Sequence, residues 1–157
     1  MFTISKQNMR ISGFLLMCEK RQVCPALKKD EKNWDLETKQ EVIAAVLRNT
    51  DLPKIYLSWV PEDPREDDGC LYSVVKGRRK LLAILEFYEG KFPLPDRLDL
   101  MPGEEAVIGG MYYDELAEKY PRLADRFLSF RLDFVKILTD ERDSVRTVRE
   151  TAERLEE

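Results

Sequence analysis

The chain changes from a strand pattern to a helix pattern at one glycine, Gly77. Before it, Leu71–Val75 is rich in apolar and β-branched residues, which is typical of a strand. After it, Arg78–Tyr88 carries apolar residues at helical spacing, and Gly90 ends that pattern. Because glycine weakens both kinds of element and favours turns, the chain must place a strand and a helix end to end.

Two further segments have clear signals. Asp35–Arg48 predicts a helix, since Asp35 can accept a hydrogen bond in the first turn and Asn49 can end the helix. Lys54–Val60 is rich in β-branched and aromatic residues and predicts a strand. We expect it to form an antiparallel hairpin with the strand before Gly77.

The other elements are expected from shorter patterns. They are a strand or a helix at Arg10–Cys18, a loop at Gln22–Asn33, a short helix at Asp114–Tyr120, a turn at Leu123–Leu128, and a strand at Phe130–Leu138. Together they predict an α+β fold, a small mixed sheet with flanking helices.

The length of 157 residues suits one domain, which we place at residues 1–139. Residues 140–157 read as a charged helix with a narrow apolar seam at Val145, Val148, Ala152 and Leu155. This seam either packs on its own domain or forms a contact with a partner protein or a second copy of the chain.

Composition excludes several kinds of chemistry. The chain has no histidine, which removes histidine bases, histidine metal ligands and Ser-His-Asp sites. With Cys18, Cys24 and Cys70 the cysteine count is odd and no CxxC pair occurs, so we expect three reduced thiols and no metal site. A net charge of −4 argues against broad coating of DNA. No run is long and apolar enough for a membrane span, and we expect a cytoplasmic protein.

A candidate phosphate-binding site is formed by Lys76, Gly77, Arg78, Arg79 and Lys80. The start of a helix presents free backbone N–H groups and partial positive charge, and glycine allows an anion to approach closely. Cations at this end of a helix repel the dipole, so an anionic partner would stabilise them. The alternative is a charged turn that is solvated or paired with the acidic loop at Glu62–Asp68.

The order of several short motifs resembles the ParB/sulfiredoxin-like superfamily. It is most similar to the ParB-like N-terminal domain of GmrSD-type restriction enzymes. The matching segments are Pro53–Leu57, Val74–Leu81, Phe87–Phe92, Gly110–Leu116 and Phe127–Leu132. The run Gly77–Ala83 also resembles the central G-E-R-R-x-x-A motif of ParB proteins.

The resemblance implies a domain that binds the phosphate of a nucleotide or a nucleic acid. Gly77 would supply the tight turn, and Arg79 and Lys80 would bind the phosphate of, for example, a nucleoside triphosphate with Mg²⁺. Lys76 stands where this branch has an acidic residue, which implies weak or no hydrolysis, as in a pseudoenzyme. No catalytic residue is assigned.

Two other functions remain open. One is an active nucleotidase or nuclease whose acid comes from Asp67, Asp68 or Glu86. The other is a regulator or decoy of a restriction or partition system, in a phage or mobile element, that acts through protein–protein contacts. Trp34 likewise has two interpretations: it anchors its loop on the first helix, or it stacks on a base.

Overall fold

The computed structural model describes residues 2–59, 70–100, 103, 104, 106–139, 150, 153 and 154. Its elements are β1 (Phe2–Arg10), α1 (Ile11–Glu19), α2 (Leu36–Leu47), β2 (Ile55–Trp59), β3 (Ser73–Lys76), α3 (Arg78–Tyr88), α4 (Tyr113–Lys119), α5 (Pro121–Ser129) and β4 (Arg131–Thr139). The mixture of helices with one four-stranded sheet confirms the α+β class.

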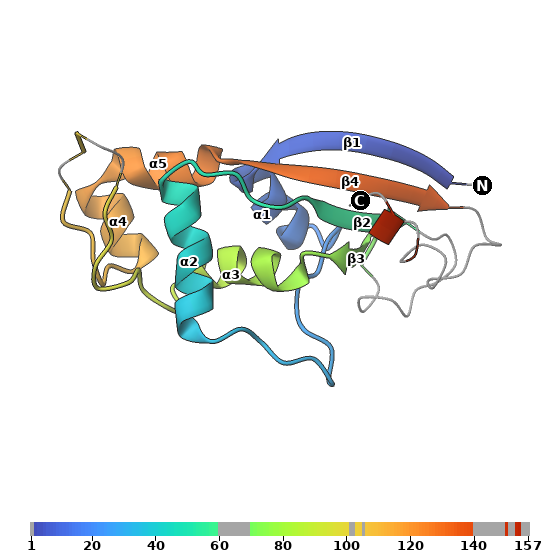
Figure 1. The fold of residues 1–157 in the computed structure, drawn as a ribbon, viewed down its shortest axis with the longest axis horizontal. Coiled ribbons are helices and arrows are strands. Elements are labelled where there is room, and N and C mark those ends of the chain that lie inside the picture. Colours follow the sequence, from blue (N-terminus) through green and yellow to red (C-terminus); the bar gives the residue numbers. More distant parts are fainter. Residues whose placement is uncertain are drawn as a thin grey trace.

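The sheet has the strand order β1-β4-β2-β3, and it is mixed (Figure 1). The first and last strands, β1 and β4, pair antiparallel along their whole length, from Phe2 opposite Thr139 to Arg10 opposite Arg131. Strand β4 runs parallel to β2, and β2 pairs antiparallel with β3. The expected hairpin of β2 and β3 is confirmed, and it lies at the sheet edge opposite β1.

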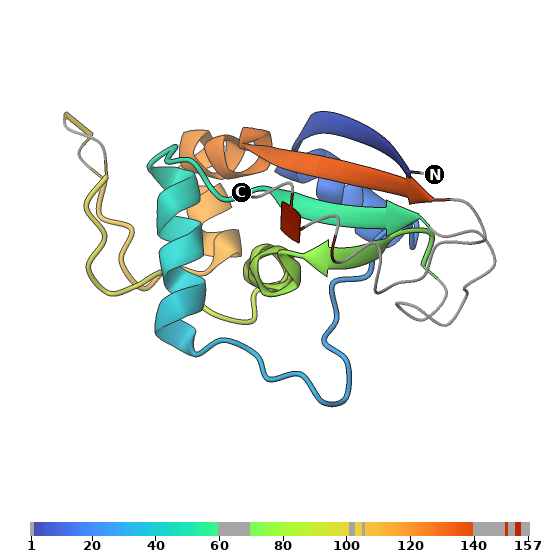
Figure 2. The ribbon, with the colours of Figure 1, turned by 45° about the vertical axis from the view of Figure 1, so that its right-hand side comes forward.

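Helices cover one face of the sheet and form the main core with it (Figure 2). Because strand side chains alternate between faces, Ile55 and Leu57 of β2 enter this core while Tyr56 lies on the opposite face. Strand β4 does the same with Phe134 and Val135. Both faces of the central strands are therefore buried.

The helix predicted at Asp35–Arg48 is confirmed as α2. Asp35 caps it, since its Oδ1 accepts a 2.8 Å hydrogen bond from the Thr38 N–H. At the other end Asn49 adopts a positive φ of 56°, and its N–H donates to Val46 O. Asn49 is thus the residue just after the C-cap, in the left-handed conformation that ends many helices.

Three segments differ from, or sharpen, the sequence expectations. The ambiguous Arg10–Cys18 is a helix, α1. The turn expected at Leu123–Leu128 is wrong, because α5 spans Pro121–Ser129 with Pro121 in its first turn. Proline is well suited to that position, since its missing N–H would have no partner there. Strand β1 was not predicted. It is an edge strand of largely exposed residues that depends on pairing with β4.

The expectation of three reduced cysteines is wrong, because Cys24 and Cys70 form a disulfide. Their Cα atoms lie 6.1 Å apart, within the range that a disulfide spans. Two main-chain contacts bring them together, since Tyr72 N–H donates to Gln22 O at 2.8 Å and Val23 forms a bridge with Tyr72. Cys18 is a free thiol.

Some expectations fall outside the described residues. These are the acidic tip at Pro61–Gly69 with Asp67 and Asp68, and most of the charged helix at residues 140–157. The division into residues 1–139 and 140–157 therefore stays a prediction. Among the helices of the described residues, none combines the length and the apolar character that crossing a membrane requires.

Candidate phosphate-binding site

Gly77 joins β3 to α3 in a conformation that favours glycine. Its φ of 96° lies in the left-handed region, and its carbonyl accepts the first helical hydrogen bond, from Leu81 N–H at 3.0 Å. A Cβ at this position would lie 2.9 Å from Cγ1 of Ile55 on β2, which is too close. Both the backbone angle and the packing against β2 therefore require glycine here.

The N-terminus of α3 has no side-chain cap within the described part of the chain, and its first turn has no acidic residue. The residues there are Arg78, Arg79 and Lys80. Their backbone N–H groups precede that of Leu81, the first donor with an intrahelical acceptor, so the helix itself cannot satisfy them. This end of α3 concentrates N–H donors, the positive end of the dipole and cationic side chains.

A cavity of about 470 Å³ opens at this junction. We call it the junction cavity. One wall comes from β3 and the start of α3, and the other from the loop between α1 and α2. Its lining residues are Lys28, Asp30, Glu31, Val74, Val75, Lys76, Gly77, Arg78 and Arg79. Four cations face two carboxylates in this lining, so a net positive cavity adjoins the N-terminus of α3.

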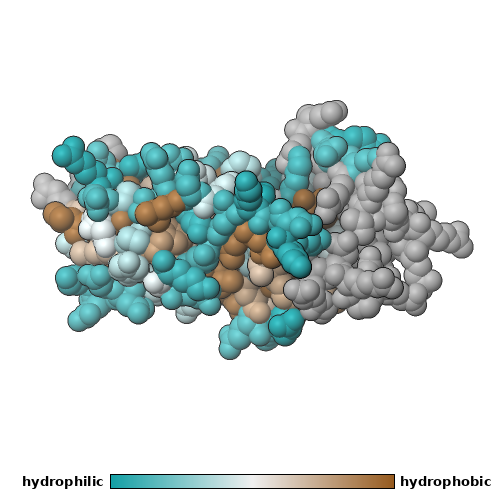
Figure 3. Space-filling view, turned by 90° about the horizontal axis from the view of Figure 1, so that it is seen from below, coloured by the Kyte–Doolittle hydropathy of each residue, from teal (hydrophilic) through white to brown (hydrophobic). Residues whose placement is uncertain are grey.

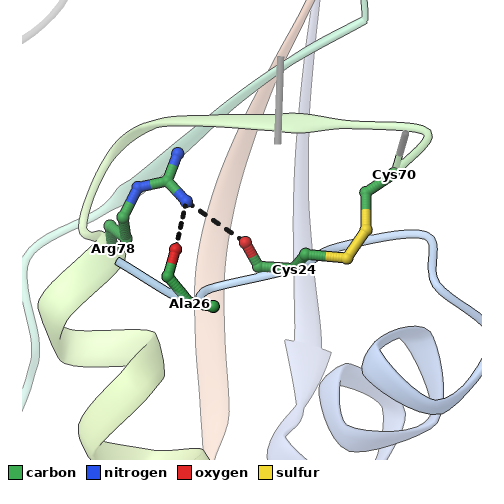
Figure 4. The surroundings of a disulfide bond; sticks show 4 residues. All are labelled: Cys24, Ala26, Cys70 and Arg78. Atoms are coloured by element: carbon green, nitrogen blue, oxygen red, sulfur yellow. Dashed lines mark hydrogen bonds between the residues drawn. A yellow bond between two sulfur atoms is a disulfide. The ribbon is translucent and has the colours of Figure 1, made fainter. Parts of the chain in front are cut away.

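Arg78 is a buried structural anchor. Only 8% of the residue is exposed. Its Nη1 donates to Cys24 O and Ala26 O, both at 3.2 Å (Figure 4). Its Nη2 donates to Val74 O at 3.1 Å. Its Nε lies 3.7 Å from a carboxylate oxygen of Glu31. The guanidinium thus holds the loop between α1 and α2 against the end of β3.

The other predicted cations lie in different surroundings. Arg79 donates one hydrogen bond, from Nε to Lys32 O at 2.6 Å, and its side chain lines the junction cavity. Lys76 also lines it. Lys80 instead donates to Pro53 O at 3.2 Å, and it is not part of the lining. The structure therefore brings Lys76, Gly77, Arg78 and Arg79 together and turns Lys80 elsewhere.

The opposite wall was largely missed from the sequence. Lys28, Asp30 and Glu31 lie in the segment predicted as a loop, Gln22–Asn33, and none of them was a candidate site residue. Glu31 accepts a hydrogen bond from Lys28 N–H at 3.1 Å, which closes a turn of the loop. The sequence does show a run of charged residues in this loop. Such a run does not indicate which element of the fold the loop contacts.

Trp34 and Glu86 both lie outside the lining of the junction cavity. Trp34 is partly buried and packs against the main core. The Glu86 carboxylate lies 3.2 Å from Lys39 Nζ and also accepts a hydrogen bond from Asn33. Eight residues separate Glu86 from the start of α3, which is about 12 Å along the axis. Within the described residues, no group of three or more metal-ligating side chains occurs.

A second cavity, of about 630 Å³, lies between α1, α3 and α5. We call it the helix groove. It is lined mostly by apolar side chains, including Leu15, Leu85 and Leu128, together with Cys18. Burial, and to a lesser extent the charge of Glu89, raises the pKa of Cys18 to about 12, so its thiol stays protonated. Figure 3 shows an apolar strip with hydrophilic residues around it on the face seen from below.

No protein-family model, curated protein or solved structure matches this chain.

Proposed function

We propose that the chain is a ParB-like module that binds the phosphate of a nucleotide or a nucleic acid in the junction cavity, with weak or no hydrolysis. The observation that supports this most directly is the geometry at Gly77. A glycine that the fold requires opens α3 onto a cavity in which cations outnumber carboxylates. A phosphate at this point would be stabilised by the helix dipole and by the side chains together.

The lining suggests separate roles for its two arginines. Arg79 uses one of its five N–H donors for Lys32, so its terminal nitrogens can turn to a phosphate in a bidentate bond. Lys76 adds a second positive charge from the strand side. Arg78 acts indirectly, since its hydrogen bonds hold the opposite wall in place.

The described residues offer weak support for hydrolysis. Asp30 and Glu31 are the carboxylates of the lining, and either could hold Mg²⁺ that arrives with a nucleoside triphosphate. Glu31 is already engaged by Arg78 and by the Lys28 N–H. Glu86, the described member of the acids considered for catalysis, is paired with Lys39. Binding without efficient turnover fits this arrangement best.

Titration calorimetry at low salt with CTP, ATP, GTP and a short DNA duplex tests the proposal. We expect at least one ligand to bind, and Arg79→Glu to weaken binding about tenfold or more, because charge-assisted bonds become repulsive. Arg97→Glu is the matched control, since Arg97 is exposed in a loop outside the cavity lining and the change in net charge is identical.

Two results would count against binding in the junction cavity. One is the absence of binding by all four ligands at low salt. The other is equal weakening by Arg79→Glu and Arg97→Glu, which would indicate a general charge effect. Phosphate release with Mg²⁺ or Mn²⁺ above background would instead favour an active hydrolase.

A second candidate function, protein–protein interaction, is favoured by the helix groove. Leu16 and Tyr88 in its lining are 47% and 41% exposed, and several apolar residues lie between them. Light scattering at high protein concentration tests self-association through this surface. A dimer that Leu16→Glu converts to a monomer supports it, and a wild-type monomer counts against it.

A cytoplasmic location is part of the first proposal, since nucleotides and DNA are found there. Disulfides in that compartment are usually transient or redox-sensing.

A further inference from the structure

The disulfide between Cys24 and Cys70 fastens one wall of the junction cavity to the other. Cys24 lies in the loop between α1 and α2, which further on carries the lining residues Lys28, Asp30 and Glu31. Cys70 lies just before β3, whose end carries Lys76 of the opposite wall. The cross-link joins positions that are 46 residues apart in the sequence.

Residues 24–26 are also held by Arg78, the first residue of α3. Arg78 donates to the carbonyls of Cys24 and Ala26, and the side chain of Cys24 itself forms the disulfide (Figure 4). Any change in the position of Cys24 is therefore transmitted directly to the guanidinium beside Gly77. Further along the loop, Arg79 holds Lys32 O. One covalent bond and several hydrogen bonds thus fix this wall.

Both cysteines of the pair lie outside the main core. Cys24 and Cys70 are partly exposed, and the main core consists of apolar residues that do not include them. The hydrogen bonds from Arg78 and Arg79 do not involve sulfur, so reduction of the disulfide does not itself remove them. We therefore expect reduction to loosen the loop while the fold is retained.

The third cysteine does not compete for either partner. Cys18 lies in the helix groove, and its thiol stays protonated because burial raises its pKa to about 12. Disulfide exchange requires a thiolate as the attacking group. Cys24 and Cys70 can therefore open and close as a pair without rearranging to Cys18.

We propose that Cys24–Cys70 is a reversible redox clamp on the junction cavity: the disulfide holds the loop at residues 24–33 against the start of α3, and reduction releases it. The consequence for ligand affinity rests on the proposed phosphate-binding function. A preorganised wall binds more tightly, because less conformational entropy is lost when the ligand arrives.

The chemical step is ordinary thiol–disulfide exchange with a cellular dithiol. One thiolate of the dithiol attacks a sulfur of the pair and displaces the other cysteine as a thiolate. The second thiolate of the dithiol then resolves the mixed disulfide. Cys24 and Cys70 gain two electrons and two protons in total, and the dithiol loses both as it becomes a disulfide.

The first measurement follows the loop and needs no ligand. Amide hydrogen exchange is compared between the oxidised chain, the chain reduced with dithiothreitol, and the double variant Cys24→Ser with Cys70→Ser. We expect exchange at residues 26–33 to be about tenfold faster in both reduced forms, with α2 and β4 unchanged. Cys18→Ser is the control and should behave as the oxidised wild type.

The second measurement follows the site. Calorimetry with ATP should give about three- to tenfold weaker binding for the double variant than for the oxidised chain. Equal exchange in the oxidised and reduced forms overturns the clamp, and ATP binding of measurable but equal affinity in the two forms overturns its effect on the site. Loss of the far-ultraviolet circular dichroism signal on reduction also overturns it, since the bond would then be a structural staple.

The two proposals can fail separately. If ATP binds neither redox form while exchange at residues 26–33 still depends on the disulfide, the clamp on the loop is supported and the proposed phosphate-binding function is overturned.

Discussion

Helices α2 and α3 begin in opposite ways. Helix α2 is capped by Asp35, which accepts a hydrogen bond from Thr38 N–H, and Glu37 follows in its first turn. Helix α3 begins at Gly77, with no side-chain cap among the described residues, and cations occupy its first turn. The start of α2 thus provides an acceptor for one of its own N–H groups and negative charge near the positive end of its dipole, whereas α3 adds positive charge to a positive end.

The difference separates a helix start that serves stability from one that suits a ligand. A capping carboxylate stabilises α2 whether or not anything binds. The cations of α3 add to the positive end of its dipole, and an anion bound there would offset this charge. Arg78 also has three carbonyl acceptors and lies near Glu31. Substitutions at either helix start test this difference between α2 and α3.

The largest effect is expected for Arg78→Met. It removes the donors from three carbonyls whose hydrogen bonds are buried or partly buried, and leaving such acceptors unsatisfied destabilises the folded state by about 3 kcal/mol in total. Urea denaturation measures the free energy of unfolding. Arg79→Met is the matched control, and we expect it to lose less than about 1 kcal/mol because one hydrogen bond is removed. Equal losses for the two variants would contradict the buried role of Arg78.

The next effect concerns two glycines with positive φ. Gly77→Ala should destabilise the chain by about 2–3 kcal/mol, through the left-handed backbone and the contact with Ile55. Gly90 has a φ of 79°, and nothing lies within 4 Å of a Cβ placed there. Gly90→Ala should therefore lose only about 1–2 kcal/mol, the backbone part. Urea midpoints that are the same for both variants would mean that the contact with Ile55 relaxes freely.

Inorganic phosphate should stabilise the chain through the start of α3. At ten times its dissociation constant, a ligand of the folded state adds about 1.4 kcal/mol to the free energy of unfolding. We expect the melting temperature to rise in phosphate relative to chloride of the same ionic strength. The rise should disappear in Arg79→Glu and persist in Arg97→Glu. A rise of the same size in all three proteins would indicate a general salt effect.

The smallest effect is expected at the start of α2. Hydrogen bonds from the Thr38 side chain and backbone lower the pKa of Asp35. Because the pKa is lower in the folded state, the ionised carboxylate stabilises the fold above the unfolded-state pKa of about 3.9. This stability is lost as the pH falls through the folded-state pKa. Asp35→Asn keeps an oxygen acceptor that cannot ionise, so it should lose less stability between pH 6 and pH 3. Identical pH profiles in urea denaturation would refute this.

Much of the fold was predictable from local patterns. The hairpin of β2 and β3, the helices α2 and α3, and strand β4 follow from residue spacing and from end signals such as Asp35 and Gly77. Strand β1 was not predictable in this way, since an exposed edge strand has little apolar–polar pattern of its own and depends on pairing with β4. Helix α5 was predicted only as a turn, although Pro121 is well suited to the first turn of a helix.

The sequence by itself determined that a glycine-led helix start with four neighbouring cations would follow β3. Only the tertiary structure decided what each cation does. Arg78 binds the carbonyls of Cys24 and Ala26, which lie 54 and 52 residues earlier in the chain, while its neighbour Arg79 lines the cavity. Contacts of Tyr72 with Gln22 and Val23, also far apart in the sequence, pair Cys24 with Cys70. Local patterns report the spacing of side chains, but a buried donor or a thiol takes its role from partners that only folding brings near.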